Sequence, residues 1–261
     1  MFIHRSTAAA IRSSVVLICI VTLNCSTKGA VADESQIRLD SNDYDPSCGI
    51  DVAQDGSLIR VVWPLDSRRR GQLTFDLTRN RPLIHTAAVS PQDSDSFQQI
   101  GQGLNPMVQV RVGNRDLQRR GGWTIFFDRM QRKPNQVFRA TIRKKNAEVT
   151  SNARRATLTI GDVSAGPFQG YLRWTFYAGN SFVLQEAVLK TELDGQAFLF
   201  DTGLLCRSTN PTSMVWRDSN GPLRSEAVDA IKQPRNLAVR GRAIAAQFPN
   251  GSVGMFPSAK M

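Results

Sequence analysis

Residues 170 to 205 read GYLRWTFYAGNSFVLQEAVLKTELDGQAFLFDTGLL, and this stretch decides the fold class. Over residues 172–177 apolar and polar side chains alternate, and this period of two is typical of a half-buried strand. Leu172, Trp174 and Phe176 therefore share one face of the predicted strand, and the polar side chains between them share the other.

Turn signals bound this strand and the two that follow it. Gly179-Asn180 tolerates positive φ and predicts a turn, after which residues 182–191 form a second predicted strand. Asp194-Gly195 suits a two-residue hairpin turn and leads to a third strand over residues 196–200. The pattern predicts an antiparallel meander, which is marginally stable alone and must bury its apolar face against a second sheet.

Short strands recur along the rest of the chain. The same alternation, bounded by turn residues, predicts strands over residues 58–63, 72–77, 83–89, 107–112, 123–127, 137–144, 156–160, 243–248 and 252–256. Residues 102–106 are expected to form a loop, and residues 225–232 a helix capped by Ser225. Strands of this length and spacing favour a sandwich or barrel over alternating β/α units.

We therefore expect an all-β fold, a two-sheet antiparallel β-sandwich of the supersandwich type. It forms a single domain over residues 50–261, after a polar, flexible lead-in over residues 33–49. The sequence stops five residues after the last predicted hairpin. That short tail leaves open a fold that is incomplete at the C-terminus.

The first 32 residues have the three regions of a secretory signal peptide. Arg5 and Arg12 precede an apolar run over residues 14–23, and Ala30-Val31-Ala32 provides a small-residue cleavage site. A membrane-spanning helix requires roughly 20 apolar residues, and this run is half as long. We expect cleavage after Ala32 and a secreted or periplasmic protein, with a lipoprotein acylated at Cys25 as the less favoured alternative.

Charge points to acidic partners. The formal net charge is +11, and removal of Arg5, Arg12 and Lys28 with the leader lowers it to +8. Most of the basic clusters fall in predicted loops and strand ends, where a solvated surface is one interpretation and attraction to an anionic polymer or an envelope surface is another. These clusters lie at residues 68–70, 119–120, 129–133, 143–145 and 154–155. No pairing of aromatic and basic residues typical of an RNA-binding sheet is present, so nucleic acid is not an expected partner.

Cysteine and histidine usage limits the chemistry. After cleavage only Cys48 and Cys206 remain, and either a disulfide worth about 4 to 5 kcal/mol or two separate thiols fits the sequence. His85 is then the single histidine, so no zinc motif exists. The acidic loop at residues 92–96 lacks the later glycine and glutamate of a calcium loop. The sequence predicts no metal site and no cofactor.

Four residues are candidates for a functional site. Glu186 lies within a predicted strand beside apolar neighbours, Asp201 ends the next strand, and His85 is the only imidazole that remains. These are the possible catalytic residues, acting as acid, base or hydrogen-bond acceptor at a sugar oxygen. Arg173 is a candidate ligand-binding residue, although an ion pair with Glu186 explains both side chains without catalysis.

The strand sequences carry a family resemblance. The segments GQLTFDL (71–77), RPLI (81–84), LRWTFY (172–177) and LQEAV (184–188) resemble secreted bacterial β-supersandwich proteins related to galactose-mutarotase-like domains, over residues 57–256. The resemblance implies a large sandwich with a concave side that faces sugars. Mutarotase-type catalysis relies on histidines and a carboxylate, and with only His85 present no family catalytic residue is carried over.

These observations predict a secreted carbohydrate-associated protein with a binding or accessory role. One alternative is a glycan-active enzyme of the mutarotase-like, hydrolase or lyase kind, and the other is a structural protein of the cell envelope without a small ligand. Whether the protein is an enzyme, and in which oligomeric state it exists, stay open at this point.

Overall fold

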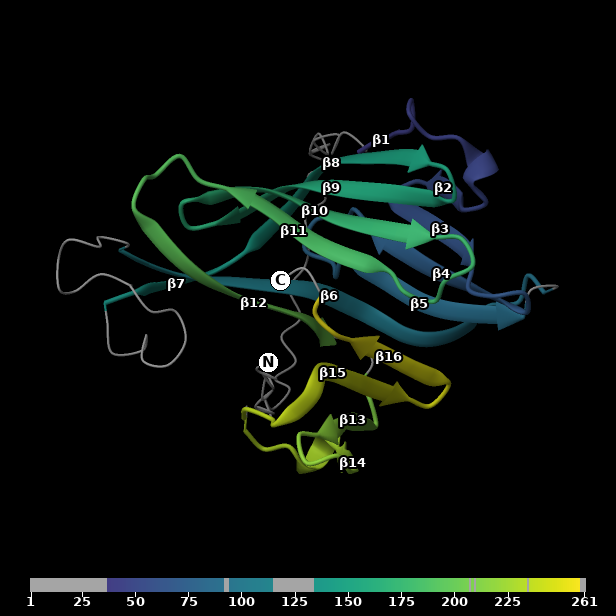
Figure 1. Ribbon diagram of the computed structural model, residues 1–261. Coiled ribbons are helices and arrows are strands. Elements are labelled where there is room, and N and C mark those ends of the chain that lie inside the picture. The colour runs from purple at the N-terminus through teal and green to yellow at the C-terminus, as the bar shows by residue number, and fades with distance from the viewer. Residues whose placement is uncertain are drawn as a thin grey trace, which may run out of the picture.

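A computed structural model describes residues 37–91, 94–114, 134–206, 208, 210–233 and 235–258. Over these residues the protein is built of sixteen strands in three sheets, with two short 3-10 turns (Figure 1). Two large sheets form the layers of a sandwich, so the predicted all-β, two-sheet antiparallel sandwich is confirmed. The predicted signal peptide and the predicted strand at 123–127 lie outside the described residues.

The first layer is a five-stranded sheet. Its strands in spatial order are β1 (Leu39–Asp40), β8 (Thr141–Asn152), β9 (Arg155–Ala165), β10 (Phe168–Tyr177) and β11 (Leu184–Lys190). All neighbours are antiparallel except β1 and β8, which run parallel.

The second layer is a seven-stranded antiparallel sheet. Its strands in spatial order are β12 (Gln196–Cys206), β6 (Gln98–Asn114), β5 (Ile84–Pro91), β4 (Arg69–Asp76), β3 (Leu58–Pro64) and β2 (Asp51–Asp55), and β7 (Gln136–Arg139) pairs with the second half of β6. Because β6 is long, it reaches beyond β5 and offers that remaining edge to β7.

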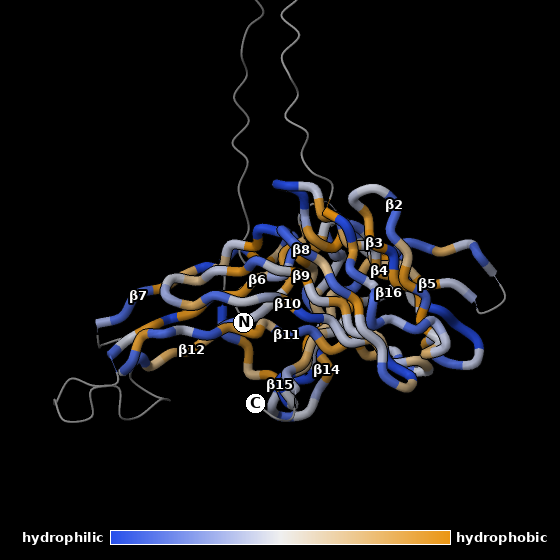
Figure 2. The backbone as a smooth tube through the Cα atoms, turned by 90° about the horizontal axis from the view of Figure 1, so that it is seen from above, coloured by the Kyte–Doolittle hydropathy of each residue, from blue (hydrophilic) through white to orange (hydrophobic). Residues whose placement is uncertain are grey.

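Aromatic rings join the two layers in the core. Phe75 and Trp174 lie with ring centroids 4.9 Å apart, and Trp63 and Phe176 form an edge-to-face pair at 5.0 Å. Such pairs contribute about 0.5–1.5 kcal/mol each beyond the area that they bury. Both layers alternate hydrophobic and hydrophilic residues along their strands (Figure 2), and the predicted stripe of Leu172, Trp174 and Phe176 is fully buried.

A third, four-stranded sheet extends the sandwich and was not predicted. Its strands in spatial order are β14 (Leu223–Ala227), β13 (Ser213–Asp218), β15 (Val239–Phe248) and β16 (Gly251–Met255), drawn in yellow-green to yellow in Figure 1. Phe248 joins the main core, and Asn250 Nδ2 donates a hydrogen bond to the Gln99 carbonyl at 3.1 Å. The predicted C-terminal hairpin is β15 with β16.

The predicted three-strand meander is wrong in its last pairing. β10 and β11 form the expected hairpin, but β12 pairs with β6 in the opposite layer. Asp194-Gly195 makes a turn that carries the chain from one sheet to the other (Figure 1). The local pattern identifies a strand, whereas its partner depends on which edge is free, and the edge of β6 accepts eleven residues of β12.

Three further expectations differ from the structure. Residues 102–106 belong to β6, where Gly103 at φ 65° accommodates the irregular backbone. Residues 225–227 belong to β14, because pairing with β13 overrides the helical pattern, and only the 3-10 turn Val228–Ala230 is helical. The lead-in contacts the sandwich from Ile37 onward, since Leu39 pairs with Ala147.

Candidate functional site

The outer face of the five-stranded sheet carries rows of polar side chains. Because residues paired across neighbouring strands project from the same face, the observed register defines each row. The first row runs from β11 to β8 through Glu186, Arg173, Thr159 and Glu148. In β10, Arg173 lies on this outer face because the residues on either side of it in the strand enter the core.

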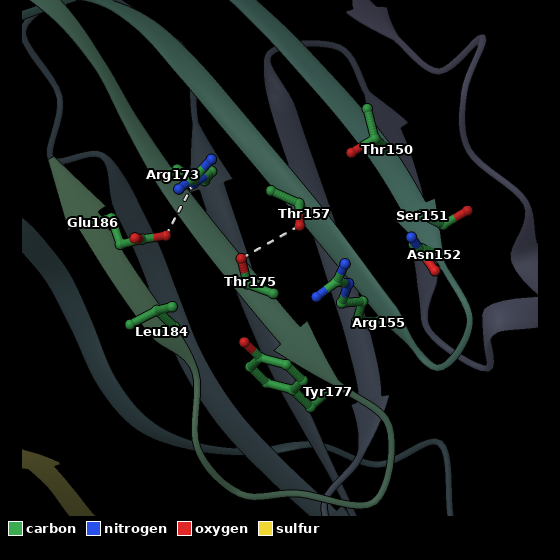
Figure 3. A pocket seen from close by; sticks show the side chains of 10 residues that line it. All are labelled: Thr150, Ser151, Asn152, Arg155, Thr157, Arg173, Thr175, Tyr177, Leu184 and Glu186. Carbon is green, nitrogen blue, oxygen red and sulfur yellow. Dashed lines mark hydrogen bonds and ion pairs between the residues drawn. The ribbon is translucent and has the colours of Figure 1, made fainter. Parts of the chain in front are cut away.

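Two further rows lie beside the first. The second row consists of Leu184, Thr175, Thr157 and Thr150, and the third of Tyr177, Arg155 and Asn152. Except for Thr159 and Glu148, the residues of these rows line a shallow depression with a volume of about 460 Å³ (Figure 3). Its lining side chains are Thr150, Ser151, Asn152, Arg155, Thr157, Arg173, Thr175, Tyr177, Leu184 and Glu186.

An ion pair occupies one end of the depression. Arg173 Nε donates a hydrogen bond to Glu186 Oε2 at 3.0 Å, and the two side chains are 37% and 30% exposed. This hydrogen bond raises the pKa of Arg173 above its ordinary value, although partial burial opposes the shift. The two charges balance each other, so this pair leaves no net charge in the site.

Hydroxyl groups form the centre. Thr157 Oγ1 and Thr175 Oγ1 lie 3.3 Å apart and share a hydrogen bond. Figure 3 shows the Tyr177 hydroxyl and the Arg155 guanidinium turned toward these two threonines from the opposite end to the ion pair. The depression therefore presents neutral hydrogen-bonding groups between an internal ion pair and a second arginine.

The structure brings together two of the four predicted site residues. Arg173 and Glu186 meet in the depression, whereas His85 and Asp201 belong to the seven-stranded sheet and do not line it. His85 lies where the register of β5 against β4 shifts, and Asp201 Oδ2 accepts a hydrogen bond from Gln109 Nε2 at 3.4 Å. No common groove holds all four among the described residues.

The remaining lining residues were not predicted as a site. The sequence feature that could have identified some of them is the set of polar residues in the alternating strand β10, which includes Thr175 and Tyr177. Arg155 belongs to a basic pair that was interpreted with the other basic clusters. Finding these residues together required the register of β9 against β10, and local sequence does not supply it.

Among the described residues, no group of three or more histidine, cysteine and acidic side chains could hold a metal ion. In the same part of the chain, no helix has the length and apolar character to cross a membrane. Cys48 is buried, Cys206 is half-buried, and both are free thiols.

No protein-family model matches the sequence, and no curated protein matches it either.

Proposed function

We propose that this is an exported carbohydrate-associated binding protein whose ligand occupies the depression on the five-stranded sheet. The observation that carries the proposal is the lining itself, in which guanidinium, carboxylate, amide and hydroxyl groups surround a single aliphatic residue, Leu184. Sugars present closely spaced hydroxyls that both donate and accept, and charged planar side chains make the stronger hydrogen bonds to such groups.

Tyr177 adds a feature that suits a sugar ring. Its ring combines an apolar body with a hydroxyl that points toward the threonines (Figure 3). Aromatic side chains with a polar end are favoured at binding surfaces that are partly apolar and partly wet. A pyranose ring has the same character, because its C–H groups form apolar patches between polar edges.

The composition of the site favours binding over hydrolysis. Glycoside hydrolysis generally uses two carboxyl groups about 5–9.5 Å apart. The depression is lined by one carboxylate, Glu186, and Arg173 holds it in an ion pair. Asp201 and His85, the other residues of the enzyme alternative, lie in the second layer.

The experiment that tests the proposal is a glycan array with neutral and acidic sugars, followed by calorimetric titration of the retained glycans. Arg173→Met should reduce affinity about tenfold or more, because a hydrogen bond to a charged group contributes about 1.5–3 kcal/mol. Thr175→Val should reduce it about two- to tenfold, because a neutral hydrogen bond contributes about 0.5–1.5 kcal/mol.

A matched control separates the site from general destabilisation. Thr74 and Thr175 are equally buried, each 7% exposed, but Thr74 belongs to β4 in the other sheet. Thr74→Val should leave affinity unchanged. Failure to bind any neutral or acidic glycan would overturn the proposal in favour of a structural envelope role, and turnover of a bound glycan would establish the enzyme alternative.

Export is tested separately. Sequencing the N-terminus of the protein recovered outside the cytoplasm should begin at Asp33, immediately after the predicted cleavage site. A mature chain that retains residues 1–32 would contradict this part of the proposal.

A further inference from the structure

We infer that the ligand of this depression is an acidic saccharide, and that Arg155 binds its carboxylate or sulfate group. This inference rests on the proposed function, since it assigns the chemical class of the sugar at the same site. It follows from the charge balance of the lining and from the position of Arg155.

Arg155 supplies the unbalanced charge of the depression. Of the three charged side chains that line it, Arg173 and Glu186 neutralise each other through their 3.0 Å contact. Within the part of the chain that the structure describes, Arg155 forms no ion pair or hydrogen bond through its side chain. The lining therefore carries one net positive charge, concentrated at a side chain exposed to solvent.

Glu148 and Glu186, the two acids in the rows of this face, lie at a distance from Arg155. Asp43 and Asp45 contact Ser151 of the lining through backbone atoms, and the Asp45 carboxylate accepts hydrogen bonds from Ser47. Glu148 is four residues along β8 from Asn152, which shares the row of Arg155, and four residues of strand span about 13 Å. Glu186 lies two strands away from Arg155, in the first row. Since charges separated by more than about 8 Å are largely screened at physiological ionic strength, neither carboxylate cancels Arg155.

The surroundings of Arg155 suit an anionic substituent on a sugar. A guanidinium presents a planar fork that matches the two oxygens of a carboxylate or sulfate. Tyr177 and Asn152 flank it in the same row and can hydrogen-bond to adjacent ring hydroxyls. The net charge of the exported chain, +8 after removal of the leader, would also raise the rate at which an anionic glycan arrives.

The test uses pairs of glycans that differ only in the acidic group. Binding of the full-length protein is measured by calorimetry to oligogalacturonate and its methyl ester, and to sulfated galactan and its desulfated form. We expect at least tenfold tighter binding to one acidic member, and the pair that shows it distinguishes a carboxylate from a sulfate. Arg155→Gln should abolish this discrimination, and Arg155→Lys should restore part of it.

Arg154→Gln is the matched control. Arg154 is adjacent, is also exposed and carries the same charge, but it does not line the depression, and its guanidinium lies near Gly179. Arg154→Gln should keep the preference for the acidic glycan. Equal losses in Arg154→Gln and Arg155→Gln, with unchanged melting temperatures, would show attraction by overall charge and overturn the assignment.

The two proposals fail differently. Equal affinity for the acidic and neutral members of both pairs would overturn the inference about Arg155 and leave carbohydrate binding intact. No binding to any glycan of the array would overturn the proposed function, and the inference with it.

Discussion

Lys144 Nζ donates a hydrogen bond to the backbone carbonyl of Asp76 at 2.6 Å, which ties a strand of the five-stranded sheet to the end of β4 in the other layer. The same ammonium group donates to the carbonyls of Thr78 and Arg81 at 2.9 and 2.8 Å. Lys144 is only 5% exposed, although a solvated surface was one interpretation of the basic clusters, to which residues 143–145 belong. One buried cation therefore satisfies three carbonyl groups of the β4–β5 connection.

Replacing this lysine should destabilise the protein. Lys144→Met removes the three donors and leaves the buried carbonyl of Asp76 and the part-buried carbonyls of Thr78 and Arg81 unsatisfied. A buried unsatisfied carbonyl costs about 1–3 kcal/mol. We expect the free energy of unfolding, measured by urea denaturation, to fall by about 3 kcal/mol or more. Lys145→Met is the control, because Lys145 is 63% exposed and forms only a surface pair with Asp162. Equal losses in both variants would refute the structural role of Lys144.

The same group should give stability a pH dependence in the alkaline range. Burial lowers the pKa of Lys144 to about 8, although the nearby Asp76 carboxylate opposes the shift. In the unfolded chain the pKa is about 10.4. Between about pH 8 and 10.4 the unfolded state therefore binds more protons than the native state, so this group makes stability rise with pH across that window.

The measurement is the difference in unfolding free energy between the wild type and Lys144→Met at several pH values. The difference should be constant below about pH 8, grow in favour of the wild type up to about pH 10.4, and then level off. A difference that stays constant up to about pH 10.4 and shrinks only above it would mean that the native-state pKa of Lys144 is raised.

The ion pair of the depression should matter more for binding than for folding. Arg173 and Glu186 are both about one third exposed, and pairs of this kind contribute about 0–1 kcal/mol. A double-mutant cycle with Arg173→Met and Glu186→Gln should give a coupling in unfolding free energy within that range. Under the proposed function, affinity for a glycan should nevertheless fall in each single variant. A coupling of several kcal/mol would instead identify a mainly structural pair.

The close approach of β10 and β11 should depend on Gly170. A Cβ atom at this position would lie 1.9 Å from the Val188 carbonyl oxygen, so the two strands would have to separate. We expect Gly170→Ala to lower the unfolding free energy by about 1–3 kcal/mol. Gly203→Ala is the control, since its nearest new contact, the Met107 methyl group at 3.5 Å, is ordinary. Identical melting temperatures for the two variants would contradict this close contact.

The two cysteines should not be linked to each other. Cys48 and Cys206 are free in the structure, and burial raises the pKa of Cys206, which slows thiolate reactions. Peptide mapping under non-reducing conditions should find no cross-linked peptide. Removal of a native disulfide lowers the free energy of unfolding by about 2–5 kcal/mol. Cys206→Ser should not show a loss of this size. Recovery of a peptide that links Cys48 to Cys206 would show instead that the two cysteines form a disulfide.

Local sequence determined most of the strands and their faces. The alternation over residues 172–177 predicted that Trp174 would enter the core and that Arg173 would not, because side-chain direction in a strand depends only on residue parity. The Arg173–Glu186 contact was predictable for the same reason, since both residues lie in one hairpin with a short connection. The two-sheet sandwich followed from the number of such strands.

Only the tertiary structure decided which strands are neighbours. β12 pairs with β6 instead of continuing the meander, and this choice separates Asp201 from Glu186. The register of β9 against β10 brings Arg155 beside Tyr177, and a strand irregularity carries Lys144 into the interior. Pairing and register are set by contacts between residues far apart in the chain, and periodicity within one strand contains no information about them.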